Sequence, residues 1–190
     1  MTSMRSTIEG IASLGTIDVR DTFFRHAAPN RDAFAGGTMG RWGASFPVIY
    51  LGRPEAGVVI EAYRHLVEDA GVPREHVRPR ILYTVPVVVT KILDLTERSA
   101  RRHLDLEDAD LASEVGDYDE CQRVAAAAHQ LRLHGILAPA AHEHGTTLAL
   151  FRERLPVEEL PVPSGQAVWE QLPEDPRRLR LVQREESEGS

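Results

Sequence analysis

Four residues in the N-terminal part of the chain are the best candidates for chemistry: Arg25, Arg41, Tyr50 and Glu61. Arg41 lies in a glycine-rich segment, and glycines let the backbone approach a ligand closely. Arg25 and Arg41 together could bind a pyrophosphate group, because a guanidinium forms paired hydrogen bonds to phosphate oxygens. The same two arginines would also suit a solvated surface, which is the commoner place for this residue type.

Tyr50 and Glu61 both lie in apolar surroundings. Tyr50 belongs to the apolar run 47–51, where it is either a core tyrosine with a hydrogen-bonded hydroxyl or a ring that stacks on a flat ligand. Glu61 stands between Ile60 and Ala62 in an apolar helical pattern. Because glutamate is almost never fully buried without a partner, its carboxylate faces either solvent or a polar site, and the sequence leaves both open.

These candidates are carried by four predicted elements. Aromatic residues over 22–26 predict a short strand that holds Arg25, and a polar, glycine-rich loop over 30–45 holds Arg41. Residues 47–51 predict a second strand. Apolar side chains recur at helical spacing over 55–70, which predicts a helix with Glu61 near its middle.

The remainder of the chain mixes strands and helices. The predicted strands are 81–89, 90–95, 136–138 and 146–151, with an interruption at Pro86, and the predicted helices are 97–103, capped by Thr96, and 119–133. Since the elements lack a regular strand–helix–strand alternation, we expect a single α+β domain with mixed β-sheets flanked by helices. Residues 1–15 are predicted to be a loosely ordered lead-in, and 161–190 a C-terminal extension whose last residues have a composition typical of disorder.

Composition restricts the compartment in which the protein works. Cys121 is the single cysteine, so no internal disulfide can form and a reducing compartment is favoured. Residues 1–15 lack the apolar core of a signal peptide. The longest apolar run has the length of a strand rather than of a membrane span. We therefore predict a cytoplasmic protein without membrane contact.

Charge and histidine spacing argue against two further classes. The formal net charge is −7 at pH 7, so the chain lacks the positive field of a protein that binds nucleic acid directly. His142 and His144 could chelate a metal, but a structural zinc site takes four protein ligands and a catalytic one three. We therefore predict a solvated loop there and no metal. The glycines at 36, 37 and 40 also lack the spacing of a dinucleotide-binding fingerprint.

The order of these short motifs resembles the RES-domain family, which is named for an arginine, a glutamate and a serine. The motifs are Phe24-Arg25, Gly40-Arg41-Trp42, Val48-Ile49-Tyr50-Leu51, Ile60-Glu61-Ala62, Glu120-Cys121-Gln122, the segment 135–141 and the strand 148–151. The similarity covers residues 16–154 and is greatest to the mycobacterial NAD-phosphorolysing members; the domain itself is placed at 16–160. Each motif is short, and the specificity lies in their shared order and spacing.

The resemblance implies a fold like that of the ADP-ribosyltransferases and a toxin that degrades NAD+ by cleaving the nicotinamide–ribose bond. Glu61 would stabilise the cationic, oxocarbenium-like ribose, Arg25 and Arg41 would bind the pyrophosphate, and Tyr50 would stack near the nicotinamide or ribose. Inorganic phosphate or water would be the acceptor, and no further cofactor is implied. The implied partner is an Xre-like helix-turn-helix antitoxin whose C-terminal segment blocks the pocket, in a complex with several copies of the toxin.

The sequence departs from the family pattern at three places, and two alternative functions stay open. Ala140 stands where the family serine usually follows the proline, Gly43 replaces a common asparagine, and the loop before Arg41 is short. A protein ADP-ribosyltransferase is one alternative, although Val59 stands where such enzymes commonly carry a second Glu or Gln. A degenerate domain that only binds a partner is the other, and Ala140 is its best support.

Overall fold

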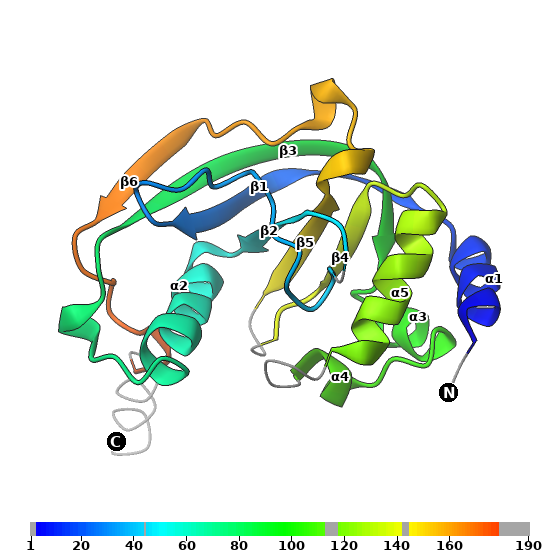
Figure 1. Cartoon of the computed structure of the whole chain (residues 1–190), viewed down its shortest axis with the longest axis horizontal. Helices are drawn as coiled ribbons and strands as arrows, with labels where there is room; N and C mark the ends of the chain where they lie inside the picture. Colours follow the sequence, from blue (N-terminus) through cyan, green and yellow to red (C-terminus); the bar gives the residue numbers. More distant parts are fainter. Residues whose placement is uncertain (1–2, 44, 113–117, 142–144, 179–190) are drawn as a thin grey trace, which may run out of the picture.

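One mixed β-sheet forms the centre of the molecule in the computed structural model, which describes residues 3–43, 45–112, 118–141 and 145–178. The strand order is β1-β2-β5-β4-β3-β6, and β1 also pairs with β3. This extra pairing closes the first five strands of that order into a barrel-like ring, while β6 extends β3 (Figure 1). The strands are β1 (Ile17–Ala27), β2 (Val48–Arg53), β3 (Arg80–Asp94), β4 (Gly135–Pro139), β5 (Thr146–Phe151) and β6 (Gly165–Trp169).

Alternate residues of the five ring strands fill its interior. Neighbouring side chains of a strand point to opposite faces of the sheet, so each ring strand contributes one row to a common core. This cluster of buried side chains includes Phe23, Ile49, Val85, Leu137 and Leu148. Burial of apolar area of this kind is the main force that holds such a ring closed.

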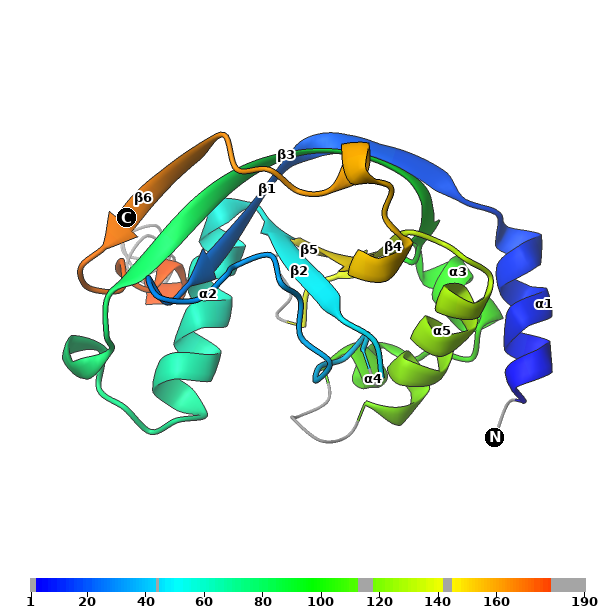
Figure 2. The ribbon, with the colours of Figure 1, turned by 45° about the horizontal axis from the view of Figure 1, so that its top comes forward.

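Helices cover two flanks of the ring (Figures 1 and 2). On one flank, α5 (Asp119–Gln130) contributes Val124 and Ala128 to a second buried cluster with Phe151 of β5. On the other, α2 (Glu55–Tyr63) packs against β1 and β2, and its apolar side chains form a third cluster with Leu82 of β3 and Trp169 of β6. The other helices are α1 (Met4–Leu14), α3 (Arg98–His103) and α4 (Asp108–Ala112), with short turns η2 (Arg74–His76), η3 (Arg152–Arg154) and η4 (Val157–Glu159).

The helix predicted over 55–70 changes its winding partway. It is α-helical to Tyr63 and continues as the π-helical turn η1 (Arg64–Glu68). The backbone N–H of Asp69 donates to the carbonyl of Arg64 at 2.7 Å, one residue further along than in an α-helix. Such wide turns are frequent at functional sites.

Both ends of the chain are more structured than their sequence suggested. In place of a loosely ordered lead-in, residues 4–14 form α1, which is capped by the Ser3 side chain and buries Ile11 against the α5 flank. Part of the expected C-terminal extension forms β6, which pairs with β3 from Arg80 to Thr84. Residues 179–190 lie outside the described part of the chain. The helix and the strand become stable only because each has a partner distant in sequence.

The predicted interruption at Pro86 was wrong, because β3 runs through it as one strand. Pro86 pairs with Thr22 of β1, and a proline has no N–H to offer a second neighbour. On the other edge of β3, β6 pairs up to Thr84 and β4 begins only at Ile92. An N–H at Pro86 would therefore point to an edge of β3 that has no strand partner at this place in the described residues. The predicted cap was wrong as well, since the Thr96 hydroxyl donates to Asp94 and Glu97 is the N-cap of α3.

The α+β interpretation is confirmed, with one continuous sheet in place of several. Over the described residues, the helices are all too short or too polar to cross a membrane.

Candidate active site

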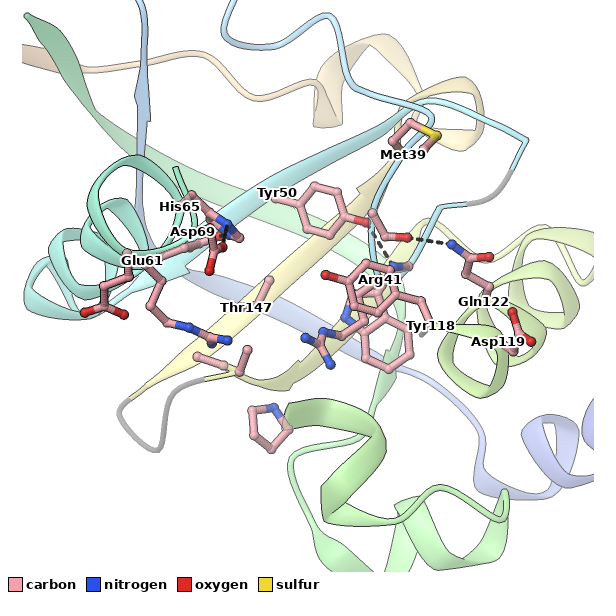
Figure 3. A pocket seen from close by; sticks show the side chains of 17 residues that line it. Met39, Arg41, Tyr50, Glu61, His65, Asp69, Tyr118, Asp119, Gln122 and Thr147 are labelled. Carbon is pink, nitrogen blue, oxygen red and sulfur yellow. Dashed lines mark hydrogen bonds and ion pairs between the residues drawn. The ribbon is translucent and has the colours of Figure 1, made fainter. Parts of the chain in front are cut away.

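A cavity with a volume of about 980 Å³ lies between the α2 and α5 flanks of the ring. Its walls include three of the four candidates, Arg41, Tyr50 and Glu61. Figure 3 shows Glu61 on the α2 side, Arg41 beside α5, and Tyr50 between them on β2. Residues from the helices α2 and α5, from the three strands β2, β4 and β5 and from the loops near them thus converge on one space.

The turn that carries Arg41 is fixed by its own backbone and by α5. The N–H of Gly43 donates to the carbonyl of Gly40 at 3.3 Å. The side-chain amide of Gln122 donates to the same carbonyl at 3.0 Å. Gly40 has a φ of +149°, and a Cβ there would lie 2.7 Å from the Tyr50 hydroxyl oxygen. Only glycine fits at this position, for both reasons.

The Arg41 guanidinium is held at the cavity wall by neighbours on the α5 flank. Its Nη1 donates to the carbonyl of Asp110 at 2.7 Å. Its central carbon lies 4.9 Å from the centre of the Tyr118 ring, a cation–π arrangement. A guanidinium fixed in this way holds its positive charge at a set place on the cavity wall, which suits recognition of an anion.

Tyr50 fixes the same turn from the other side. Its hydroxyl oxygen accepts a hydrogen bond from the backbone N–H of Trp42 at 2.9 Å. Burial raises the pKa of the hydroxyl above its ordinary value, although the Trp42 hydrogen bond and the charge of Arg41 act in the opposite direction. The group therefore stays protonated at neutral pH, and a phenol that accepts one hydrogen bond can still donate another.

Glu61 faces the cavity, which resolves the choice that its sequence context left open. Its side chain is 42% exposed, and its Oε1 lies 3.9 Å from Nε2 of His65, one helical turn further on. His65 in turn contacts Asp69 through Nδ1 at 3.1 Å. Figure 3 shows these three side chains along one side of the helix. A carboxylate that faces the cavity can stabilise a positive charge that develops on a bound ligand.

Arg25 is not among the residues that line the cavity. Its Nη1 donates to the backbone carbonyl of Tyr50 at 2.6 Å, and its buried Nε has no partner in the described residues. Burial lowers the pKa of Arg25, and the nearby charge of Glu61 counteracts this shift. Arg25 therefore lies behind the β2 wall, where the opposite charge of Glu61 favours its charged form.

The sequence prediction missed several residues of this cavity: Arg64, His65, Tyr118, Gln122 and Thr147. Arg64 and His65 follow Glu61 by three and four positions. Side chains at these spacings share a helix face, so this signal was available. Gln122 belongs to the motif Glu120-Cys121-Gln122, but nothing in that motif marked it as a cavity residue. Thr147 gave no comparable signal, because it comes from a distant part of the chain.

Two of the three departures from the family pattern, Ala140 and Gly43, have structural consequences. Ala140 lines the cavity, so the hydroxyl that a serine would supply there is absent, while Thr147 on β5 offers one in the same wall. Gly43 is buried, and a Cβ there would meet a methyl of Val48 at 2.9 Å. In this conformation the turn has no room for the asparagine side chain.

Cys121 has the features of a structural thiol. It is buried at the start of α5, and its sulfur contacts the carbonyl of Asp110 at 3.6 Å. Burial raises the pKa of this thiol to about 12, so it is protonated at neutral pH, and a protonated thiol is a poor nucleophile.

No group of three or more potential metal ligands occurs within residues 3–43, 45–112, 118–141 and 145–178. His142 and His144, for which we predicted a solvated loop, lie outside these residues.

Comparisons with known proteins agree on one family. Residues 17–171 match the RES domain. NAD(+) phosphorylase MbcT of Mycobacterium tuberculosis is 31% identical over 155 residues, which cover 77% of this chain and 82% of MbcT. A second protein of that organism, probable NAD(+) phosphorylase Rv3189, is 39% identical over 110 residues, or 57% of this chain and 50% of its own length.

A solved structure gives the same result for the fold. A chain in the crystal structure of the M. tuberculosis MbcT–MbcA toxin–antitoxin complex matches with a TM-score of 0.76 at 28% identity. The match covers 87% of this chain and 93% of that one. The resemblance inferred from the order of the short motifs is thereby confirmed, and the chain belongs to the RES-domain family.

Proposed function

We propose that this protein is an NAD+-degrading toxin that cleaves the nicotinamide–ribose bond and passes the ADP-ribosyl group to inorganic phosphate. The observation that carries the proposal is the single cavity in which Arg41, Tyr50 and Glu61 meet. The similarity to NAD(+) phosphorylase MbcT, which extends over 77% of this chain, supports it. NAD+ is then the substrate and phosphate the co-substrate, and the residues in the cavity need no further cofactor.

The bond changes require little proton transfer. The bond between ribose C1 and the nicotinamide nitrogen breaks, and its electron pair goes to the ring nitrogen and cancels the positive charge there. An oxygen of HPO₄²⁻ forms the new bond to C1. The products are neutral nicotinamide and ADP-ribose 1-phosphate, whose phosphate keeps its proton. With water as the acceptor, a base would have to remove a proton, so hydrolysis makes a further demand on the site.

Each of the four candidate residues has a role that follows from its surroundings. Glu61 stabilises the positive charge that develops on the ribose. Arg41, fixed by Asp110 and Tyr118, binds the diphosphate of NAD+. Tyr50 positions the Arg41 turn and presents its ring and hydroxyl to the nicotinamide–ribose part of the substrate. Arg25 supports Glu61 and Tyr50 from behind the wall rather than through direct substrate contact.

The finer features of the family belong to the same proposal. They are a fold related to the ADP-ribosyltransferases, an Xre-like helix-turn-helix antitoxin that blocks the cavity, a complex with several toxin copies, and action in the cytoplasm. The presence of the similar chain in a toxin–antitoxin complex supports an antitoxin partner. The single cysteine, Cys121, suits a reducing compartment.

The two alternatives are less well supported by the cavity. Transfer of ADP-ribose to a protein would be favoured by a second acidic or amide residue two positions before Glu61, but that position is Val59, which is buried in the α2 cluster. A domain without catalysis would be favoured by Ala140. However, the other polar groups of the cavity, including Thr147 in the same wall, remain in place.

The test is NAD+ consumption by the purified protein with and without phosphate, with products identified by mass spectrometry. We expect consumption that requires phosphate and yields nicotinamide with ADP-ribose 1-phosphate. Formation of ADP-ribose regardless of phosphate would instead indicate hydrolysis. No consumption by the free protein under either condition would overturn the proposed function.

The matched variants are Arg41→Ala, which removes a cavity cation, and Arg20→Ala, which removes an exposed arginine outside the cavity. Activity lost in the first and kept in the second would assign consumption to this cavity rather than to a contaminating enzyme.

A further inference from the structure

Arg64 is the cavity cation without a role so far. It lies at the junction of α2 and the π-helical turn, is half-buried and lines the cavity. Within the described residues, its guanidinium takes part in no side-chain hydrogen bond or ion pair, while Arg41 across the cavity is tied to Asp110 and Tyr118. A half-buried guanidinium that faces a cavity with its donors unused is well suited to bind an anion.

The carboxylates near Arg64 are occupied by other partners. Glu68 accepts a hydrogen bond from Arg177 at 2.5 Å, and Asp69 is paired with His65 at 3.1 Å. Both residues also line the cavity. Because these acidic groups are engaged elsewhere, the Arg64 charge remains available to a ligand.

The position of Arg64 relative to Glu61 identifies the ligand. Arg64 follows Glu61 by three residues, so the two side chains lie on the same helix face, one turn apart. The new bond to ribose C1 forms where Glu61 stabilises the positive charge. The acceptor must therefore approach beside Glu61, within reach of Arg64. Arg41, the other arginine of the cavity, lies on the opposite wall and binds the diphosphate.

We infer that Arg64 binds the acceptor, inorganic phosphate, and holds it beside Glu61 for attack on ribose C1; this inference rests on the proposed function. The cation offsets the repulsion between the phosphate and the Glu61 carboxylate. It also orients an oxygen of the phosphate toward the carbon. Arg64 thereby favours phosphate over water as the acceptor, because the phosphate dianion forms charge-assisted, paired hydrogen bonds with a guanidinium and neutral water does not.

The test varies phosphate at saturating NAD+, and NAD+ at saturating phosphate, at an ionic strength kept constant with chloride. In Arg64→Ala we expect the KM for phosphate to rise about tenfold to a hundredfold, the range for a lost charge-assisted hydrogen bond. The KM for NAD+ should stay near the wild-type value. Arg64→Lys should lie between, because lysine keeps the charge but loses the paired hydrogen bonds.

Two further variants distinguish an effect on phosphate binding from misfolding. Arg64→Gln keeps most of the side-chain length without the charge and should also raise the KM for phosphate. Arg20→Ala, on the exposed surface, should change neither KM. A KM does not depend on the fraction of protein that is folded, so a partly folded variant still gives a valid answer.

The failure of this inference can be told apart from failure of the proposed function. If Arg64→Ala raises the KM for NAD+ and leaves that for phosphate unchanged, Arg64 binds the diphosphate and the inference is overturned. An unchanged phosphate KM with unchanged NAD+ KM overturns it as well. A wild-type protein that consumes no NAD+ overturns the proposed function itself.

Discussion

The hydroxyl oxygen of Tyr50 lies 2.9 Å from the backbone nitrogen of Trp42, whose hydrogen it accepts. Through this bond a residue of strand β2 fixes the turn on which Arg41 projects into the cavity. The sequence context suggested either a core tyrosine or a ring in contact with a ligand. In the structure the two roles coincide, because the same side chain satisfies a backbone donor and forms part of the cavity wall.

Tyr50→Phe tests this coupling. Removal of the hydroxyl leaves the N–H of the buried Trp42 without an acceptor, at a cost of about 1–3 kcal/mol in the free energy of unfolding. We also expect a lower kcat/KM for NAD+, since Arg41 loses its fixed position. Chemical denaturation and NAD+ turnover provide the two readouts. Tyr83→Phe, outside the cavity, is the control, and wild-type behaviour of Tyr50→Phe in both assays would refute the coupling.

Glu61→Gln should remove activity without unfolding the protein. The side chain is 42% exposed and its contact with His65 is 3.9 Å long, so its loss costs little stability. We expect turnover to fall by about a hundredfold or more, the usual result when an electrostatic group is removed from an active site. The exposed Glu75→Gln serves as control. If Glu61→Gln instead melts far below the wild type, the residue is structural and the catalytic assignment is wrong.

Arg25→Ala separates support of the wall from direct binding of the pyrophosphate, the role that the resemblance implied. The hydrogen bond to the Tyr50 carbonyl is lost, so we expect a loss of about 1–3 kcal/mol in unfolding free energy. Turnover should decline more than the affinity for NAD+. Arg20→Ala on the same strand is the control. A large rise in the KM for NAD+ with stability unchanged would restore direct substrate contact.

His26 should make the protein sensitive to mild acid. Burial, together with the charges of Arg80, Arg25 and His65, lowers the pKa of His26 from 6.5 to about 3. Its ring stacks on Trp169, and its Nδ1 faces the Arg80 side chain at 3.3 Å. As the pH falls below 6.5, the His26 imidazole takes up a proton in the unfolded chain. In the folded state it takes up this proton only near pH 3. Stability therefore decreases over this window, by at most about 1.4 kcal/mol per pH unit.

His26→Gln keeps an acceptor for Arg80 but cannot take up the proton. Urea unfolding between pH 7 and pH 4 should show a smaller loss of stability in this variant than in the wild type. Exposed His76→Gln is the matched control and should keep the wild-type slope. Equal slopes for His26→Gln and the wild type would show that His26 is already solvated in the folded state.

The sequence by itself determined the local elements and three of the cavity residues. Helical spacing over α2 and apolar residues in β2 and β5 depend on neighbours a few positions apart, so they can be read along the chain. The family can also be recognised from the sequence, because its motifs follow one another along the chain in a fixed order. Arg41, Tyr50 and Glu61 could be selected since each departs from its local context: a cation among glycines, and two polar groups in apolar segments.

Only the tertiary structure decided how these elements meet. The ring closes through pairing of β1 with β3, and the Arg41 turn is clamped by Gln122, which lies 82 residues from Gly40. The orientation of a side chain, as for Arg25 behind the wall and Arg64 inside the cavity, depends on how α2 and β1 pack against the ring. Contacts of this range carry no periodic signal, because they are selected by the burial of whole faces and not by neighbouring residues.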